Sequence, residues 1–411
     1  MSAVNKYRYN IILGFFKGKF PKLPVFLLKL PAYIYFYLVV VDCFRYNKLL
    51  ASINFKQDII DINSNTQIIY TDIASVHYVL TRLHDSVDNL QIVIYTIISG
   101  IFEKMYPYLI INKLNDNVKV LHVGTIDVLL LYNYKALFKE CKKRGIFVIA
   151  TYHSFCDMNV LKDIVKHCDV IFALSDSLKE ELASNGIKNV ITNYLPSAFK
   201  IDHNPLKKYE IRKSFNIPEE KIVLSIVGML RPDKGLDFFI DSVSKLEDTY
   251  KDKIFINIIG TDYLGYKHSL PKPLAESGIQ HRFIAKQTRL TDDEFVDNII
   301  VSDIYLVPYT RPSINQSGPL IDAAVRKIPV IGTDNGTIGY TIKKWNIGLT
   351  FEHGNKEDLR NKIIQMIDNI DNLNFDFTQF IKEHSIEGYI GKHKQVYNSV
   401  INQNFDISMF N

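Results

Sequence analysis

The sequence lacks the cysteine patterns that hold small secreted or metal-binding domains together. Its cysteines are never two or three residues apart, which is the spacing of zinc-ribbon and redox-pair motifs. The 411 residues include only 19 glycines and 14 prolines, and they show no internal repeat or low-complexity tract. We therefore expect an ordered cytosolic protein with reduced, mostly buried thiols at Cys43, Cys141, Cys156 and Cys168. A catalytic thiol is the alternative, although no spacing signature accompanies any of the four.

Long apolar runs are also missing. The longest covers residues 30–41, between Lys29 and Asp42, whereas a membrane-spanning helix needs about 20 residues. The apolar stretch behind the basic N-terminus is interrupted by Gly14 and Lys17, so we expect no cleavable signal peptide.

Charge of one sign is not in large excess. The chain has 49 Lys and Arg residues against 44 Asp and Glu, a formal net charge of +5. Without a basic-helix or RNA-binding motif, this mild excess predicts no nucleic-acid partner. A content of 47% hydrophobic and 23% charged residues is typical of a globular protein, and 411 residues exceed one ordinary core. We therefore expect two domains.

Residues 1–60 differ from the rest in composition. Up to Lys48 they contain eight basic residues and one acid, Asp42, with aromatic rings interleaved. Cations beside aromatic rings suit an anionic membrane surface, where rings lie at headgroup level and cations meet lipid phosphate. We expect residues 6–48 to contact the inner face of the cell membrane. The alternative is a helical arm that packs on the first domain, with its Lys stems along apolar surface.

From about residue 66 onward, short β-rich runs alternate with helices of about ten residues. This alternation predicts a parallel sheet with helices on both faces. In the first half the expected strands are 118–123, 146–153, 169–175 and 189–194. In the second half they are 221–228, 254–260, 282–285, 303–309 and 329–333, with helices at 236–246, 318–327, 356–370 and 386–403.

These runs predict two doubly wound α/β domains, over 61–200 and 201–385, and a C-terminal helix and tail at 386–411 that packs toward the first domain. The polar segment 196–220, which carries three prolines, is predicted to be the interdomain linker. In open parallel sheets ligands bind outside the carboxyl ends of the strands. We therefore expect the functional site in a cleft between the two domains.

The strongest local pattern lies at residues 227–243. A strand is expected to end at Gly228, and the loop before the next helix carries Arg231, Lys234 and Gly235. A diphosphate leaving group needs fixed positive charge while its bond breaks, and one Arg and one Lys near a helix start supply it. The alternative is a solvated basic turn.

A second pattern covers residues 309–333. Ser317 is placed as an N-cap, and Gly318 and Pro319 open the helix, so its first amides are expected to hold a phosphate or sugar hydroxyl. Asp322, one turn further on, has a carboxylate that would accept hydrogen bonds from a ribose diol. The alternative for Asp322 is an acid that complements the helix dipole.

Two histidines end consecutive expected strands. His153 follows one apolar run and His122 ends the preceding one, at the edge where sites are built. We expect a functional role for His153. For His122 the alternative, a hydrogen-bonded structural histidine, is favoured.

The order of these segments resembles the family 4 glycosyltransferases and their GT-B relatives. The segments VLHV, VIATYH and DVIFALSDSLKEEL are similar to their acceptor domain, and IVGMLRPDKGLD, SDIYLVPY and SGPLIDAAVRKIPVIGT to their nucleotide-sugar domain. The likeness covers about residues 118–400. It implies a GT-B fold and a glycosyltransferase of the hexosyltransferase type.

The resemblance also implies roles for single residues. His153 matches a histidine that faces the donor sugar, and Arg231 and Lys234 match a basic pair on the diphosphate. The remaining donor-site positions border the nucleotide or its phosphates: Gly228, Lys286, Tyr309, Ser317, Gly318 and the ribose-binding acid Asp322.

Two departures from the family pattern matter. Met229 stands where an arginine often follows the glycine, and Ile314 stands where the first of two spaced glutamates is common; Ser317-Gly318 resembles a known variant of that region. The chain also lacks an Asp-x-Asp pair, the usual ligands of a diphosphate-bound metal, so we expect transfer without a metal or other cofactor. The missing acid at Ile314 leaves open whether the reaction retains or inverts anomeric configuration.

The expected activity is transfer of a sugar from a nucleotide-diphosphate sugar to a lipid-linked or growing cell-surface glycan, such as capsule or lipopolysaccharide. Asp127, Asp157 and His122 are candidate general bases. The alternatives are a catalytically silent scaffold of a polysaccharide-assembly complex, which the residue at Ile314 motivates, and a GT-B epimerase or phosphorylase.

Overall fold

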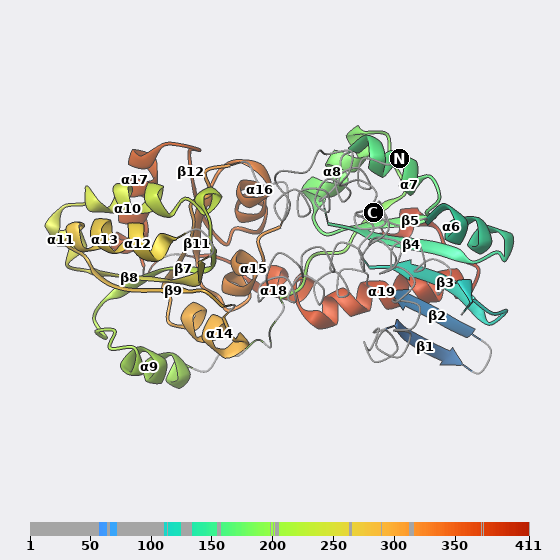
Figure 1. Cartoon of the computed structure of the whole chain (residues 1–411), viewed down its shortest axis with the longest axis horizontal. Helices are drawn as coiled ribbons and strands as arrows, with labels where there is room; N and C mark the ends of the chain where they lie inside the picture. The colour runs from blue at the N-terminus through green and yellow to red at the C-terminus, as the bar shows by residue number, and fades with distance from the viewer. Residues whose placement is uncertain are drawn as a thin grey trace, which may run out of the picture. The chain divides into compact units, whose positions relative to one another are not determined.

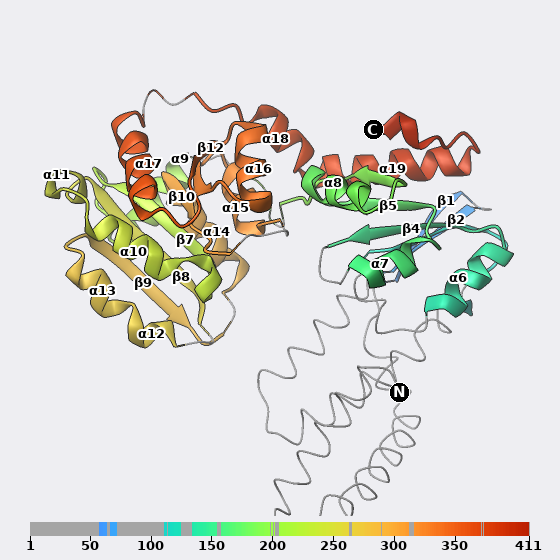
Figure 2. The same ribbon diagram turned by 90° about the horizontal axis from the view of Figure 1, so that it is seen from above.

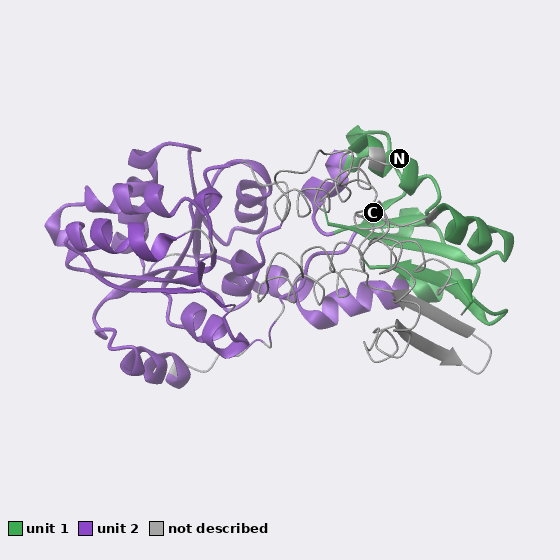
Figure 3. Ribbon diagram, viewed as in Figure 1, with its two compact units in different colours: residues 1–173, 182–191, 396–411 green, residues 174–181, 192–395 purple. Residues whose placement is uncertain are grey.

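The computed structural model describes the chain in several stretches. They are residues 57–63, 66–71, 111–112, 114–124, 134–153, 158–197, 199, 201, 205–262, 265–288, 290–311, 316–370, 372 and 374–410. The predicted membrane-contact residues 6–48, Ile314 and the base candidates Asp127 and Asp157 lie outside them. The chain divides into two compact units (Figure 3). Unit 1 comprises residues 1–173, 182–191 and 396–411, and unit 2 comprises residues 174–181 and 192–395.

Unit 1 is built on a six-stranded sheet with the order β1-β2-β3-β4-β5-β6. β1 and β2 pair antiparallel, and the pairings from β2 through β5 are parallel. The strands are β1 (Gln57–Asn63), β2 (Thr66–Thr71), β3 (Val118–Val123), β4 (Phe147–Tyr152), β5 (Val170–Ala173) and β6 (Val190–Thr192). Among the described residues, unit 1 contains the helices α6 (Tyr134–Lys143) and α7 (Met158–Val165) and the 3-10 turn η3 (Ile407–Phe410). It also contains the last residues of α8 (Asp176–Ser184) and of α19 (Ile386–Ile401), whose first residues belong to unit 2.

The core of unit 1 joins sheet residues to the end of the chain. Val120, Ile149 and Phe172 cluster with Val396 and Tyr397 in α19, and all five are buried. Residues beyond α19 pack on the same cluster. The C-terminal residues 396–411 therefore complete the hydrophobic core of unit 1 although they follow unit 2 in sequence.

Unit 2 is a second six-stranded sheet, with the order β12-β11-β10-β7-β8-β9 and parallel pairing throughout (Figure 1). Its strands are β7 (Ile222–Leu230), β8 (Ile254–Asp262), β9 (Gln280–Lys286), β10 (Ile304–Val307), β11 (Val330–Thr333) and β12 (Gly348–Phe351). Its helices are α9 (Pro205–Ser214), η2 (Pro232–Lys234), α10 (Leu236–Ser244), α11 (Asp248–Lys251), α12 (Tyr266–Ser269), α13 (Pro271–Glu276), α14 (Asp292–Ile300), α15 (Gly318–Ala324), α16 (Gly336–Trp345), α17 (Lys356–Asp368) and α18 (Thr378–Glu383).

Both faces of this sheet are buried. In β10, Ile304 and Leu306 join the cluster that contains α10 and α17, whereas Tyr305 and Val307 join the cluster that contains α14, α15 and α16. Helices cover both faces (Figure 2). Successive strand residues point to opposite faces, which explains why β10 is apolar without alternation. The prediction of doubly wound parallel sheets is confirmed.

The linker predicted at 196–220 is wrong in part, because ten of its residues form α9. Lys208 and Arg212 of this helix bond to Asp303 beside β10, so the helix is part of unit 2. Charged side chains made the segment look solvated, but their partners lie about 90 residues away in sequence. Among the described residues, no helix is both long and apolar enough to cross a membrane.

Candidate functional site

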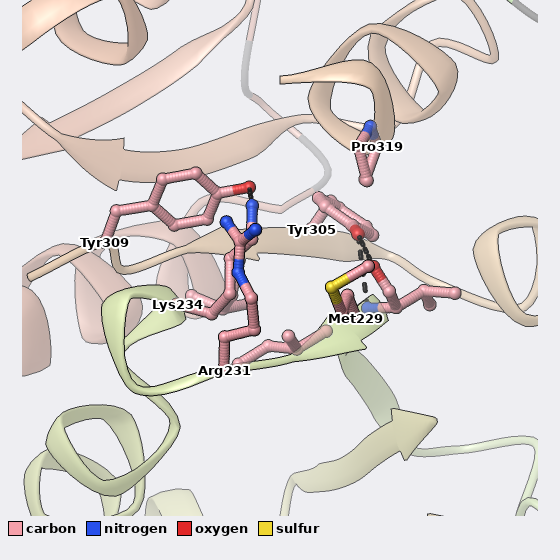
Figure 4. A pocket seen from close by; sticks show the side chains of 9 residues that line it. Met229, Arg231, Lys234, Tyr305, Tyr309 and Pro319 are labelled. Atoms are coloured by element: carbon pink, nitrogen blue, oxygen red, sulfur yellow. Dashed lines mark hydrogen bonds between the residues drawn. The ribbon is translucent and has the colours of Figure 1, made fainter. Parts of the chain in front are cut away.

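A cavity opens in unit 2 where β7 and β10 end, at the carboxyl edge of the parallel sheet. Figure 4 shows Arg231 and Lys234 side by side, reaching from the loop after β7 toward the Tyr309 hydroxyl. Met229 and Tyr305 lie beside them, with Pro319 opposite. The lining residues are Ile226, Val227, Met229, Arg231, Lys234, Tyr305, Leu306, Tyr309 and Pro319.

The floor of the cavity is rigid and buried. The Tyr305 hydroxyl donates to the carbonyl of Val227 at 2.8 Å and accepts from its N–H at 3.1 Å. Burial raises the pKa of Tyr305 well above its usual range. The floor therefore carries no charge, and the positive charge of the cavity comes from the loop after β7.

The loop after β7 is a tight turn held against the end of β10. Pro232–Lys234 forms the 3-10 turn η2, and Gly235 follows with φ +71°. A Cβ on Gly235 would lie 1.9 Å from the Pro308 carbonyl oxygen, so only glycine fits without a shift. Thr310 N–H donates to the Asp233 carbonyl at 3.0 Å and fixes the loop from the other side. This close approach fixes the backbone positions from which the Arg231 and Lys234 side chains extend.

Arg231 is held by a residue that the sequence did not single out. Its Nε and Nη2 donate to the two carboxylate oxygens of Asp233 at 3.0 and 2.7 Å, and 44% of the arginine side chain is exposed. The only sequence signal was an acid two residues from the arginine. The pair keeps the guanidinium at the cavity rather than free in solvent.

Lys234 is held by aromatic and hydroxyl groups. Its Nζ donates to the Tyr309 hydroxyl and lies 3.7 Å from the ring centroid, which is a cation–π geometry. The same hydroxyl lies 2.9 Å from Ser317 Oγ, at the start of α15. Three residues predicted for the site, Lys234, Tyr309 and Ser317, are thus one bonded chain.

Met229 lines the β7 side of the cavity, whereas its neighbour Gly228 is not among the lining residues. Gly228 has φ +129°, and a Cβ there would lie 3.6 Å from Cγ of Pro319, the second residue of α15. The strand does not end at Gly228 as predicted but continues to Leu230. Met229 is 47% exposed, so an apolar, flexible side chain stands at the rim.

The start of α15 differs from its prediction in one respect. Ser317 is the N-cap residue and Pro319 lies in the first turn, but the Ser317 side chain caps no backbone amide. It bonds to Tyr309 instead, because the phenol is within reach. Asp322 is buried and accepts from Ser197 Oγ at 2.6 Å, and neither Asp322 nor Gly318 lines the cavity.

Lys286 ends β9 and is paired with an acid. Its Nζ bonds to Glu294, which also completes the capping box of α14 with Thr291. The hydrogen bond from Lys286 holds the pKa of Glu294 below its usual value. Lys286 is not among the residues that line the cavity.

The two strand-end histidines of unit 1 have different surroundings. His122 is fully buried, with Nδ1 2.5 Å from the Tyr397 hydroxyl and Nε2 2.9 Å from Thr151 Oγ1, as expected for a structural histidine. His153 is half-buried, and its Nε2 lies 3.0 Å from the Gly124 carbonyl oxygen. Only His153 therefore offers partial access to solvent.

The described cysteines are buried thiols, as predicted. Burial raises the pKa of Cys141 to about 12 and raises that of Cys168 further. Both side chains therefore stay protonated and unreactive at neutral pH.

Comparisons with known proteins point to one class of enzyme. Residues 207–383, which contain the cavity, match the family model described as glycosyl transferases group 1. The curated relative "Putative glycosyltransferase YtcC" of Bacillus subtilis is 20% identical over 338 residues, covering 71% of this chain and 80% of the relative.

Solved structures show the fold. The Anabaena protein Alr3699/HepE in complex with UDP matches with a TM-score of 0.55 at 13% identity, over 72% of this chain and 82% of that one. A glycosyltransferase from Rickettsia africae matches with a TM-score of 0.54 at 16% identity, over 72% and 80%.

The fold and the family match together define the class, and this protein is a glycosyltransferase with the GT-B fold. The predicted likeness to the group 1 enzymes is confirmed by the match across residues 207–383.

Proposed function

We propose that this glycosyltransferase binds a nucleotide-diphosphate sugar in unit 2 and transfers the sugar to a lipid-linked or growing cell-surface glycan. One observation carries the donor half of the proposal. Two cations from one fixed loop, Arg231 and Lys234, face one cavity at the carboxyl ends of β7 and β10. The Anabaena protein of similar fold has structures with UDP and with UDP-glucose, which supports a nucleotide sugar as the donor.

The chemistry follows from charge that is in place before the reaction. When the bond between sugar and diphosphate breaks, negative charge grows on the leaving phosphate. Arg231 and Lys234 are already held by Asp233 and Tyr309, so they can stabilise that charge without reorganising. Because these two side chains supply the charge, we propose transfer without a metal ion.

Other parts of the proposal rest on the sequence. His153 is proposed to face the donor sugar, Lys286 to border the base, and Asp322 to bind the ribose. The basic aromatic residues 6–48 are proposed to hold the enzyme at an anionic membrane surface, where a lipid-linked acceptor is found.

Nucleotide binding gives the direct test. The melting temperature is measured with UDP, GDP, CMP and their sugars, for the wild type and for Arg231→Ala and Lys234→Ala. A ligand at a hundred times its Kd adds about 2.7 kcal/mol of stability. We expect one nucleoside diphosphate to stabilise the wild type and neither variant. Lys272→Ala is the matched control, because this lysine lies in the same unit and is 82% exposed away from the cavity.

Two results would contradict the proposal. Stabilisation by none of the nucleotides would favour the silent scaffold. Transfer that stops with a chelator and returns with magnesium or manganese would contradict the metal-independent step while leaving the donor site intact.

A further inference from the structure

We propose that Asp233 is a positioning residue of the diphosphate site, which presents Arg231 to the donor. The proposal rests on the proposed function and assigns a role to a carboxylate at a site meant for an anion. The motivating contact is the two-point pair between Asp233 and the Nε and Nη2 atoms of Arg231, at 3.0 and 2.7 Å.

The pair with Asp233 leaves the outer N–H donors of the Arg231 guanidinium available for a ligand. A guanidinium has five N–H donors in a planar fork. Asp233 takes the Nε hydrogen and one Nη2 hydrogen, so it binds one side of the fork. The two Nη1 hydrogens and the second Nη2 hydrogen have no acceptor among the described residues. A phosphate can therefore bind the outer end while Asp233 keeps the side.

Asp233 is itself fixed by the backbone. It lies inside the 3-10 turn η2, and its carbonyl accepts from Thr310 N–H at 3.0 Å. Thr310 directly follows Tyr309, the residue that holds Lys234. Both cations are thus held by the same two loops, the one after β7 and the one after β10. Their charged ends are therefore positioned relative to each other before a ligand binds.

The carboxylate has two opposite effects on an incoming diphosphate. It orients Arg231, which favours binding, and its negative charge repels the ligand, which opposes binding. The side chains of Arg231 and Asp233 are 44% and 30% exposed, so solvent screens the repulsion. Hydrogen bonds from an oriented guanidinium to a phosphate depend on geometry, and screening by solvent does not remove this dependence. We therefore expect orientation to dominate.

The experiment measures the Kd of UDP and GDP by calorimetry for the wild type, Asp233→Ala, Asp233→Asn and Asp233→Glu. Asp233→Ala should weaken binding of the preferred nucleotide about tenfold. Asp233→Glu, which restores a carboxylate, should recover most of the loss. Asp233→Asn, which keeps an oxygen acceptor of the same shape, should fall between the two.

A double-mutant cycle separates positioning from a general structural effect. In the Arg231→Ala background, Asp233→Ala should cause no further loss of affinity, because there is no guanidinium left to orient. In the transfer assay, Asp233→Ala should raise the KM for the donor and leave the KM for the acceptor unchanged. Melting of the unliganded variants checks that each is folded, and Asp233→Asn serves if the alanine variant is not.

Three outcomes would overturn the inference. Tighter binding by Asp233→Ala would show that the carboxylate only competes with the ligand. An equal loss with and without Arg231 would show that Asp233 acts through the turn. A wild type that binds neither UDP nor GDP would overturn the proposed function and this inference together, whereas normal wild-type binding with an insensitive Asp233 overturns the inference alone.

Discussion

Unit 2 contains two basic pairs that look alike in sequence and differ in what their donors contact. The first, which we term the anchor pair, is Lys208 and Arg212 on α9. Lys208 Nζ donates to the Ser302 carbonyl and to Asp303, both at 2.8 Å. Arg212 donates from Nε and Nη2 to the Val301 carbonyl at 3.0 and 2.7 Å, and from Nη2 to Asp303 at 2.5 Å. Backbone carbonyls and an acid of unit 2 thus bind both cations.

The second, the pocket pair, is Arg231 and Lys234. Each has one side-chain partner, Asp233 or Tyr309, and each faces the cavity. The arginine of the anchor pair is 12% exposed, against 44% for the arginine of the pocket pair. The difference separates two uses of positive charge: backbone carbonyls and a shared acid attach a helix, whereas one orienting partner leaves donors for a ligand.

The largest expected effect comes from removing a member of the pocket pair. Lys234→Ala should lower kcat/KM for sugar transfer about 100- to 1,000-fold, the range found when one donor to a developing charge is deleted. Its unfolding free energy should change little, because the side chain contributes only one part-buried hydrogen bond and a ring contact. Steady-state kinetics and urea unfolding measure the two quantities. Loss of stability without loss of rate would reverse the roles of the two pairs.

The anchor pair should show the opposite pattern. Arg212→Ala removes bonds to Asp303 and to the Val301 carbonyl, and it leaves that acid with Lys208 and a backbone amide as partners. We expect unfolding free energy to fall by about 2–3 kcal/mol, near the lower limit for breaking a buried pair. The kcat of the folded fraction should stay near wild type. A kcat loss as large as that of Lys234→Ala would place α9 in the site.

The sequence predicted five of the six described strands of unit 2, because apolar runs mark them, and it missed the short edge strand β12, GLTF. It predicted Arg231 and Lys234 because they follow one of these runs. It could not separate the two pairs. Lys208 and Arg212 lie in a polar, proline-bounded segment. Its helix and the contacts of both cations with Asp303 and with the carbonyls of Ser302 and Val301 are seen only in the structure. Asp233 was missed for the same reason: an acid near a cation is informative only once its geometry is known.

His384 differs from both basic pairs, because it is a buried polar side chain with a hydrogen bond to only one of its ring nitrogens. Its Nδ1 lies 2.7 Å from the Leu195 carbonyl oxygen, and within the described part of the chain its Nε2 has no hydrogen-bond partner. Burial lowers the pKa of His384 to about 4, whereas an unfolded histidine titrates near 6.5. Above pH 6.5 both states are neutral. Below it the unfolded state binds the proton first, so stability is lost as pH falls toward 4.

For His384 we expect the unfolding free energy to fall by about 2 kcal/mol between pH 7 and 5. His393, whose pKa burial also lowers to about 4, adds a similar share. His384→Phe should remove the contribution of His384 to this pH dependence of the unfolding free energy. Loss of the bond to Leu195 changes the stability of the variant by the same amount at every pH. Urea unfolding at pH 7, 6 and 5 measures both slopes, and equal slopes would show that His384 does not titrate in this range.

The smallest effect tests how Lys234 is held. Tyr309→Phe keeps the ring beneath Lys234 Nζ and removes the hydroxyl that bonds Lys234 and Ser317. Because the cation–π contact remains, we expect only about a fivefold rise in donor KM, or about 1 kcal/mol. Ser317→Ala, which removes only the outer bond, should cost less. A hundredfold loss in Tyr309→Phe would mean that the hydroxyl contacts the substrate directly, and the pocket pair would then be a group of three.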